Sequence, residues 1–217
     1  MPRTTRTITT LLFDWDGTLA DSAQLGLAAF QKTFAELGVA FAPDIYEAAY
    51  SPNWYLTYEA LGLPKDKWQL ADDLWRRHYG QEAAQLVSGA AETLLGLHGK
   101  GYRLGVVTSG HEHRVCGEID QSALAGIFEV VICNEDTINR KPHPEGLEIA
   151  LRRLKSQPEE AAYIGDAPED IEMGKRAGVL TVAVRSTYPS SARLLSSEPN
   201  IYLESITGLA SHFQGRF

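Results

Sequence analysis

The stretch Phe13-Asp14-Trp15-Asp16-Gly17-Thr18-Leu19 places two carboxylates, one residue apart, where an apolar run ends in a glycine turn. The run over 8–13 is rich in β-branched and apolar residues, which is typical of a buried strand that ends in a loop. Side chains two apart in an extended chain point the same way, so we expect Asp14 and Asp16 to face one site while Trp15 packs elsewhere. Because ligands of open α/β sheets bind outside the carboxyl ends of the strands, this pair is predicted to face a ligand.

Two close carboxylates repel each other unless a cation neutralises them or one of them keeps its proton. Mg²⁺ prefers one or two carboxylates together with water and phosphate oxygens. The spacing of Asp14 and Asp16 therefore favours a metal or a general acid. An acidic turn at a strand end also occurs as a cap or as a solvated loop, and the pair alone leaves these interpretations open.

The composition is that of a soluble globular protein, with 44% hydrophobic and 22% charged residues in a chain of 217. This length suffices for one large domain or for a core domain with a smaller one. The formal net charge of -8 argues against nucleic acid or an anionic membrane as a partner, because their phosphates would be repelled. An anionic substrate would therefore need a local positive site.

Cysteine usage and hydropathy indicate a cytoplasmic protein. The two cysteines, Cys116 and Cys133, form no clear disulfide framework, which suggests a reducing compartment. The N-terminal ten residues lack an apolar core, and no segment approaches membrane-spanning length. The sequence does not distinguish a monomer from a homodimer.

From about residue 90 onward, helical patterns alternate with short apolar runs. Strands are predicted over about 8–13, 103–108, 128–133, 161–165 and 179–184. Helices are predicted over about 90–98, 112–124, 144–154 and 168–177. This alternation predicts an α/β fold, a doubly wound parallel sheet with helices on both faces.

A block of some seventy residues after Leu19 is helical in pattern, with no clear strand before about residue 103. Asp21-Ser22 is expected to cap a first helix that ends at Gly38. A second stretch covers about 44–61, broken near Ser51-Pro52, and Pro64 opens a third. Because the block interrupts the α/β alternation directly after its first strand, we predict two domains, a core of 1–19 and 89–217 and an inserted helical domain of 20–88.

Three further strand ends carry polar residues. Thr108-Ser109-Gly110 can present hydroxyls and backbone N–H groups to an oxyanion, although simple capping of the next helix explains them as well. Lys141 precedes a proline turn and a helix start, where it could provide a fixed positive charge for phosphate. Asp166 leaves a strand, and Asp170 follows four residues later near the first helical turn, so both can approach one point. Acidic residues also favour helix N-termini for electrostatic reasons alone.

Together, these four stretches resemble the haloacid dehalogenase-like (HAD) superfamily, and specifically its phosphatases. The resemblance covers about 7–203 and rests on the order of an aspartate pair, a hydroxyl, a lysine and an acidic pair. It implies a Rossmann-like core and a phosphatase that acts on a small phosphorylated metabolite. In such enzymes Asp14 would attack phosphorus to form an aspartyl-phosphate, and Asp16 would protonate the leaving alkoxide and then activate water.

The resemblance also implies the binding groups. Thr108 and Ser109 would bind the transferring phosphoryl group, and Lys141 would hold its charge beside the nucleophile. Mg²⁺ would be bound by Asp14, by the backbone carbonyl of Asp16 and by Asp166, with Asp170 as a direct or water-mediated ligand. Two departures stand out, because Trp15 replaces the more usual Phe and Ala167 replaces a frequent hydroxyl residue that could support the metal ligands.

By the same resemblance, the helical insertion corresponds to the mobile cap of the phosphoglycolate phosphatase-like and sugar-phosphomutase-like branches, with hinges expected near 20–21 and 88–89. Within it, Asn53, Tyr55 and Tyr58 are candidates to meet the leaving group of the substrate. The alternative is that they form the core of the cap, since Trp54 and Tyr58 lie one helical turn apart.

The residues that follow Ser109-Gly110 are interpreted as structural. His111, His113 and Arg114 are predicted to form an exposed helix start, because the resemblance requires no histidine there. Cys133 is interpreted as a small buried hydrophobic residue.

Two alternatives to a phosphatase remain. A phosphosugar mutase of the same superfamily would return the phosphoryl group to its substrate instead of passing it to water. A phosphorylatable receiver domain also joins acidic residues, a hydroxyl and a lysine on a parallel sheet, but it is much shorter and has no inserted helical lid.

Overall fold

The computed structural model describes residues 7–80 and 83–214. The remaining residues, which include both ends of the predicted core domain and two positions of the predicted helical domain, lie outside the described part. A parallel six-stranded sheet runs in the order β5-β4-β1-β6-β7-β8, with β1 in its interior. Its strands are β1 (Thr10–Phe13), β4 (Arg103–Val107), β5 (Phe128–Ile132), β6 (Ala161–Gly165), β7 (Leu180–Val184) and β8 (Ile201–Leu203).

Helices cover both faces of this sheet, as predicted for a doubly wound fold. Alternation along β1 explains the two layers, because Leu11 and Phe13 enter one apolar cluster and Leu12 enters the other. The first cluster receives side chains from α5 (Ala90–Gly99), α6 (Glu112–Asp120) and α9 (Leu209–His212). The second receives side chains from α7 (Glu145–Leu154) and α8 (Pro168–Ala177).

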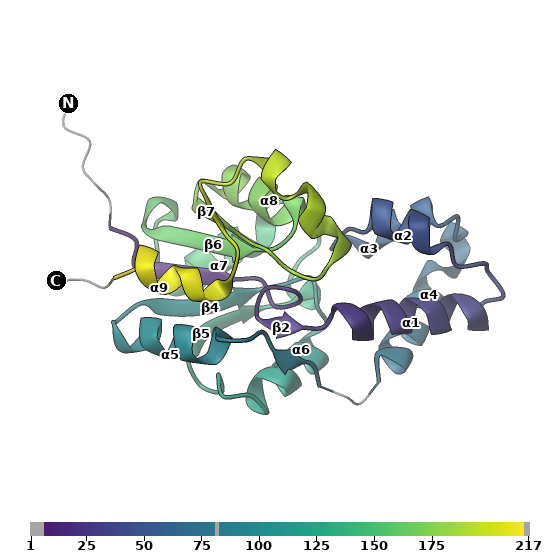
Figure 1. Cartoon of the computed structure of the whole chain (residues 1–217), viewed down its shortest axis with the longest axis horizontal. Coiled ribbons are helices and arrows are strands. Elements are labelled where there is room, and N and C mark those ends of the chain that lie inside the picture. The colour runs from purple at the N-terminus through teal and green to yellow at the C-terminus, as the bar shows by residue number, and fades with distance from the viewer. Residues whose placement is uncertain (1–6, 81–82, 215–217) are drawn as a thin grey trace.

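Four further helices form a separate layer beside the sheet, at the right of Figure 1. They are α1 (Ala23–Glu36), α2 (Pro43–Ala49), α3 (Trp54–Ala60) and α4 (Trp68–Tyr79), which we call the helical unit. The unit has an apolar cluster of its own, built around Phe30, Phe34 and Tyr58. That this unit is a distinct domain with boundaries at 19/20 and 88/89 stays a prediction.

The two connections between the helical unit and the sheet pair with each other. Strand β2 (Ala20–Asp21) lies antiparallel to β3 (Gln85–Leu86), and Val87 N–H donates to the carbonyl of Leu19. The prediction that no strand interrupts the helical block is therefore wrong at these two short segments. Runs of two residues are too short to give a periodic signal, and their pairing depends on residues far apart in the chain.

Several predicted boundaries shift slightly. The helix expected over 112–124 ends at Asp120, and β8 was not predicted at all. Short 3₁₀ helices connect other elements: η1 (Lys65–Lys67), η2 (Asn134–Asp136), η3 (Pro158–Glu160), η4 (Pro189–Arg193), η5 (Leu195–Ser197) and η6 (Ile206–Gly208). Cys133 is buried and Cys116 is a free thiol, so the expectation of a small buried residue at Cys133 is confirmed. Within the described residues, no helix combines the length and the apolar character that crossing a membrane requires.

Candidate active site

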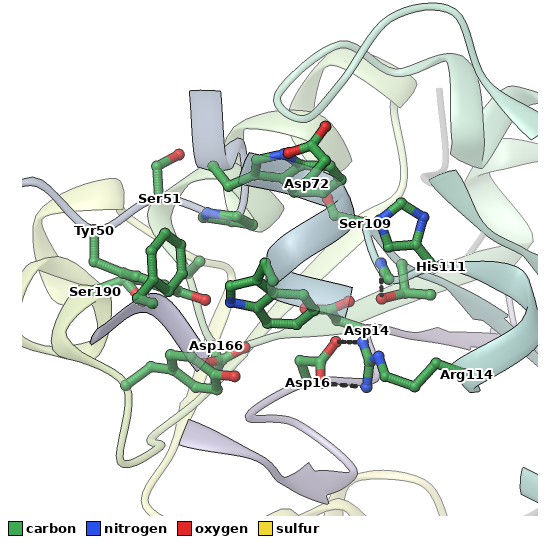
Figure 2. Close-up of a pocket in the computed structure, with 18 of the residues that line it drawn as sticks. Asp14, Asp16, Tyr50, Ser51, Asp72, Ser109, His111, Arg114, Asp166 and Ser190 are labelled. Carbon is green, nitrogen blue, oxygen red and sulfur yellow. Dashed lines mark hydrogen bonds and ion pairs between the residues drawn. The ribbon is translucent and has the colours of Figure 1, made fainter. Parts of the chain in front are cut away.

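A pocket opens at the carboxyl ends of β1, β4 and β6, between the sheet and the helical unit. The empty space in and around it is about 750 Å³, including open solvent at its mouth. Figure 2 shows Asp14, Asp16 and Asp166 on one side of it. The sheet therefore brings the predicted acidic residues to one pocket, at the edge where ligands of parallel sheets bind.

The loop after β1 needs glycine at its turn. Gly17 has a φ of +81°, a left-handed conformation that strains any residue with a Cβ. A Cβ at this position would also collide with Asp166 Oδ2 and would lie 2.7 Å from Cδ2 of Tyr188. Glycine thus permits the turn and leaves room for Asp166 beside the Asp14–Asp16 loop.

Lys141 lies between two buried carboxylates. Its Nζ is 2.9 Å from Asp14 Oδ1 and 2.7 Å from Asp170 Oδ1, and all three side chains are buried. Burial, partly opposed by the charge of Lys141, raises the pKa of Asp14 from 3.8 to about 7. Burial lowers the pKa of Lys141, but Asp14 and Asp170 outweigh it and hold that pKa above its ordinary value. Lys141 therefore stays charged beside Asp14.

Asp166 and Asp170 differ in their partners. Thr18 Oγ1 donates to Asp166 Oδ1 at 3.1 Å, and Ser186 Oγ donates to Oδ2 at 2.6 Å. Asp170 Oδ2 instead accepts the backbone N–H groups of Asp166 and Ala167, at 3.1 and 3.0 Å. Asp170 thus organises the loop that carries Asp166. Ser186 supplies a supporting hydroxyl from another element, whereas position 167 itself offers none.

The three buried aspartates Asp14, Asp166 and Asp170 form a potential cation site. One oxygen from each lies within 4.8 Å of the other two. Burial, together with the charges of Asp170 and Asp14, raises the pKa of Asp166 well above its ordinary value. Only Lys141 among the described residues forms ion pairs with this cluster. Three carboxylates against one ammonium leave negative charge in a buried place, which is costly unless a cation or protons neutralise it.

The predicted phosphate-binding hydroxyls lie at the end of β4. Thr108 is buried and its Oγ1 accepts the backbone N–H of Gly110 at 3.1 Å, while Ser109 is half-buried. Both residues line the pocket together with Gly110. Lys141 lies nearby and shares a smaller adjoining pocket with Thr108 and Ser109. The structure therefore brings together all the core residues that the sequence singled out.

The prediction for Arg114 was wrong. This residue was predicted to lie in an exposed helix start, but its side chain is only 15% exposed and it lines the pocket. Nη1 donates to Asp16 Oδ1 at 3.0 Å and Nη2 to Oδ2 at 2.5 Å, as the dashed lines in Figure 2 show. The two residues are far apart in the chain, so only the fold reveals the pair. Of the neighbouring residues, His113 is exposed as expected, whereas His111 also lines the pocket.

Asp16 is held in its charged form. Burial acts to raise the pKa of Asp16, but the Arg114 guanidinium and hydrogen bonds from Arg114 and Ser22 lower it below its ordinary value. Ser22 Oγ donates to Asp16 Oδ1 at 2.7 Å and makes no capping hydrogen bond to α1. The Ser22 hydroxyl, which was predicted to cap the first helix, therefore forms a hydrogen bond with Asp16 instead.

Trp15 is fully buried and is not among the residues that line the pocket, in agreement with the alternation that separates it from Asp14 and Asp16. Its Nε1 donates to Glu118 Oε2 at 2.6 Å. Arg114 Nη1 donates to the same oxygen at 3.0 Å, and the guanidinium lies 4.7 Å from the ring centre of Tyr79. A buried Trp15–Glu118–Arg114 chain thus supports Asp16 from behind the loop.

Of the three residues of the helical unit that were predicted to contact the substrate, only one lines the pocket. Tyr58 lines the pocket, whereas Asn53 and Tyr55 are not among its lining residues. Tyr55 stacks on Trp68, and its hydroxyl donates to Asp72 Oδ2 at 2.9 Å. Trp54, which was considered above only as a possible core residue of the cap, lines the pocket itself.

Comparisons with known proteins agree with this geometry. A family model described as "Haloacid dehalogenase-like hydrolase" matches residues 11–184. Pyrophosphatase PpaX of Bacillus pumilus is 31% identical over 214 residues, which cover 94% of this chain and 95% of that protein. Pyrophosphatase PpaX of Anoxybacillus flavithermus is 32% identical over 210 residues, with 94% and 96% covered.

Among solved structures, a haloacid dehalogenase-like family hydrolase of Streptococcus pneumoniae matches with a TM-score of 0.82 and 25% identity, covering 95% of this chain and 99% of that one. The predicted resemblance and fold class are confirmed. A receiver-type signalling domain is set aside, because the matched family is one of enzymes. The match spans most of the sheet and the whole helical unit, and this chain belongs to the haloacid dehalogenase-like hydrolases.

Proposed function

We propose that this chain is a Mg²⁺-dependent phosphatase that hydrolyses a small-molecule phosphate monoester through an aspartyl-phosphate at Asp14. The observation that carries the proposal is the position of Asp14, which lines a pocket, forms an ion pair with Lys141 and lies within 4.8 Å of the carboxylates of Asp166 and Asp170. A nucleophile, a fixed positive charge and a cation site thus meet at one strand end.

The buried charge supports a divalent cation. Asp14 and Asp166 would hold it together with the backbone carbonyl of Asp16. Both oxygens of Asp170 already accept hydrogen bonds, Oδ1 from Lys141 and Oδ2 from backbone N–H groups, which supports a contact of Asp170 through water. When bound, Mg²⁺ would neutralise phosphate oxygens and polarise phosphorus toward attack.

In the first half-reaction, a carboxylate oxygen of Asp14 forms a bond to phosphorus as the bond from phosphorus to the ester oxygen breaks. The leaving oxygen takes its electron pair and accepts a proton from Asp16, which must enter this half-reaction protonated, against the preference that Arg114 gives it. Thr108, Ser109 and Lys141 would bind the transferring phosphoryl group and balance its charge. The products are a free alcohol and phosphorylated Asp14.

In the second half-reaction, Asp16 takes a proton from a water molecule whose oxygen attacks phosphorus. The bond between phosphorus and Asp14 breaks, which returns the carboxylate and releases inorganic phosphate. The ion pair with Arg114 favours the anionic form of Asp16, which is the form that this step requires.

Two other outcomes of the same chemistry are open to test. Inorganic pyrophosphate is a candidate substrate because the relatives named above are pyrophosphatases. A phosphosugar mutase would use the same Asp14 but would return the phosphoryl group to a sugar phosphate. The mutase would retain phosphate with such a substrate, whereas a hydrolase releases it.

Phosphate release from p-nitrophenyl phosphate tests the proposal. We expect turnover with Mg²⁺, its loss in EDTA and its recovery when Mg²⁺ is restored. Asp14→Asn is expected to abolish turnover, and the matched change at the exposed Asp44, Asp44→Asn, is expected to preserve it. Hydrolysis that persists in folded Asp14→Asn would refute the mechanism.

A further inference from the structure

The side of the pocket that the helical unit provides is built from aromatic rings. Phe30, Tyr50, Trp54, Tyr58 and Trp75 all line it, and Tyr188 continues the aromatic surface from the sheet side. The rings support one another: the centroids of Phe30 and Tyr58 are 5.8 Å apart, and Tyr50 stacks on Tyr188 at 4.9 Å. A group that leaves the phosphate toward the helical unit therefore meets apolar ring surface.

The charge on this side is a single carboxylate. Asp72 is the one ionisable acid or base that the described part of the helical unit adds to the lining, apart from tyrosines. Trp54 Nε1 donates to its Oδ1 at 2.7 Å and Tyr55 Oη to its Oδ2 at 2.9 Å. In Figure 2, Asp72 lies across the pocket from Asp16 and Asp166. A second anion on a substrate would face this carboxylate without a lysine or arginine from the unit to pair with it.

The cationic side chains near the pocket are already engaged. Arg114 binds Asp16 and Glu118, and His111 Nδ1 lies 2.8 Å from Glu135 Oε1. Arg140 lies over the rings of Trp54 and Tyr55, with 3.9 Å between its guanidinium carbon and the centre of the Trp54 ring, and it lines the smaller adjoining pocket instead of this one.

We propose that the alcohol released from the substrate is uncharged and mainly apolar. The preferred substrates are then phosphate monoesters of an aromatic or branched aliphatic alcohol, ahead of pyrophosphate and of esters that carry a carboxylate. Trp75 Nε1 and Ser190 Oγ are buried without a hydrogen-bond partner among the described residues, and both residues line the pocket. They can serve a neutral oxygen of the alcohol. This inference rests on the phosphatase function proposed above.

Three alkyl phosphates with the same two-carbon spacer isolate the charge of the leaving group. They are 3,3-dimethylbutyl phosphate, which is neutral beyond the phosphate, phosphocholine, which carries a cation, and 3-(phosphooxy)propanoate, which carries a carboxylate. All three release a primary alcohol, so their intrinsic reactivity is similar. We expect kcat/KM for the neutral ester to exceed that for the carboxylate ester, and that for pyrophosphate, by roughly tenfold or more, because an unpaired anion loses its hydration in an apolar pocket.

The outcomes separate this inference from the proposed function. Faster hydrolysis of the carboxylate ester or of pyrophosphate, still abolished by Asp14→Asn, would overturn the uncharged leaving group and leave the phosphatase intact. A tenfold preference for phosphocholine over its neutral isostere would also overturn it, in favour of a cation bound by rings and by Asp72. If p-nitrophenyl phosphate and every ester of the panel stay uncleaved, the proposed function fails and this inference fails with it.

Two tryptophans of α4 provide a matched pair of variants. Trp75 lines the pocket, whereas Trp68 stacks on Tyr55 outside the lining. Trp75→Leu is expected to reduce the ratio of kcat/KM between the neutral and the carboxylate ester by roughly tenfold, mainly through KM for the neutral ester. Trp68→Leu is expected to leave that ratio unchanged. Because the ratio is internal to each folded sample, lower stability of a variant does not alter it, and an unchanged ratio in folded Trp75→Leu would contradict the inference.

Discussion

Arg114 binds both carboxylate oxygens of Asp16, at 3.0 and 2.5 Å, and thereby joins the start of α6 to the loop after β1. The same guanidinium donates to Glu118 at 3.0 Å and lies on the ring of Tyr79 at the end of the helical unit. A residue that sets the charge of Asp16 is thus in contact with the last helix of the helical unit. The proton affinity of Asp16 depends on a neighbour outside the Asp14–Leu19 loop.

Replacing this neighbour is expected to change the pH profile. In Arg114→Met, burial becomes the main influence on Asp16, so the pKa of Asp16 rises. An acid with a higher pKa keeps its proton to higher pH. The descending limb of kcat/KM plotted against pH should therefore shift to higher pH by roughly one unit. The measurement uses an alkyl phosphate, whose poor leaving group needs a proton.

Arg176→Met is the matched control, because Arg176 lies on the surface of α8 and pairs with Glu172 at 2.8 Å. The descending limb of kcat/KM for Arg176→Met should fall at the same pH as that of the unmodified protein. A purely structural Arg114 would change stability without moving the limb, so an unmoved limb in folded Arg114→Met would contradict this account of Asp16.

The sequence predicted the core of the fold well because its strands are strongly apolar and its helices periodic. The predicted boundaries of β6 and α8 match the observed ones. The carboxyl ends of β1, β4 and β6 then bring Asp14, Thr108 and Asp166 together, since parallel strands end at one edge. The sequence alone therefore predicted that these residues lie together.

The parts that were missed depend on pairing between distant segments. β8 has three residues, and β2 and β3 have two each, so none of them has a recognisable period. Arg114 carried one local signal, a spacing of four residues to Glu118 on the same helix face, but nothing in the sequence links it to Asp16. Its role emerges from the packing of α6 against the β1 loop.

The hydrogen bond from Trp15 to Glu118 is expected to contribute to stability. Trp15→Phe would leave the buried Glu118 without one donor and would leave space behind the loop, so we expect a loss of about 2 kcal/mol in the free energy of unfolding. Urea denaturation measures the loss. In a Glu118→Met background, which offers Trp15 Nε1 no oxygen acceptor, the same change should cost less, and equal losses in both backgrounds would show that the hydrogen bond contributes nothing.

The protein without metal is expected to lose stability as the pH rises from about 4 to about 7. The pKa of Asp14 is about 7 in the folded protein and 3.8 ordinarily, so between these values the folded state holds a proton that the unfolded state has lost. Stability from this group is complete below the lower value and declines toward the upper one. Thermal unfolding in EDTA checks the trend against Asp14→Asn, which should lack this contribution.

Added Mg²⁺ should oppose this loss. A cation binds the anionic form of Asp14, so it should raise the thermal midpoint more at pH 8 than at pH 5. Ca²⁺ and Na⁺ at equal ionic strength distinguish specific binding from screening. Equal shifts at both pH values would show that the cation does not bind at the aspartates.

Alanine substitutions at Gly17 and Gly38 distinguish the effect of backbone strain from that of crowding at the site. Both have positive φ, +81° and +67°, so alanine is expected to cost about 1 kcal/mol of stability at either position. A Cβ at Gly38 meets no atom of the described residues within 4 Å, whereas a Cβ at Gly17 meets Asp166 and Tyr188. Gly17→Ala should therefore also displace Asp166, weaken the Mg²⁺ dependence of phosphate release and lower kcat/KM by roughly a hundredfold, because small displacements of catalytic groups cost that much. Gly38→Ala should lose stability alone. If folded Gly17→Ala kept its activity and its apparent affinity for Mg²⁺, the position of Asp166 beside the Asp14 loop would be irrelevant to the chemistry, and the cation site would have to be sought elsewhere.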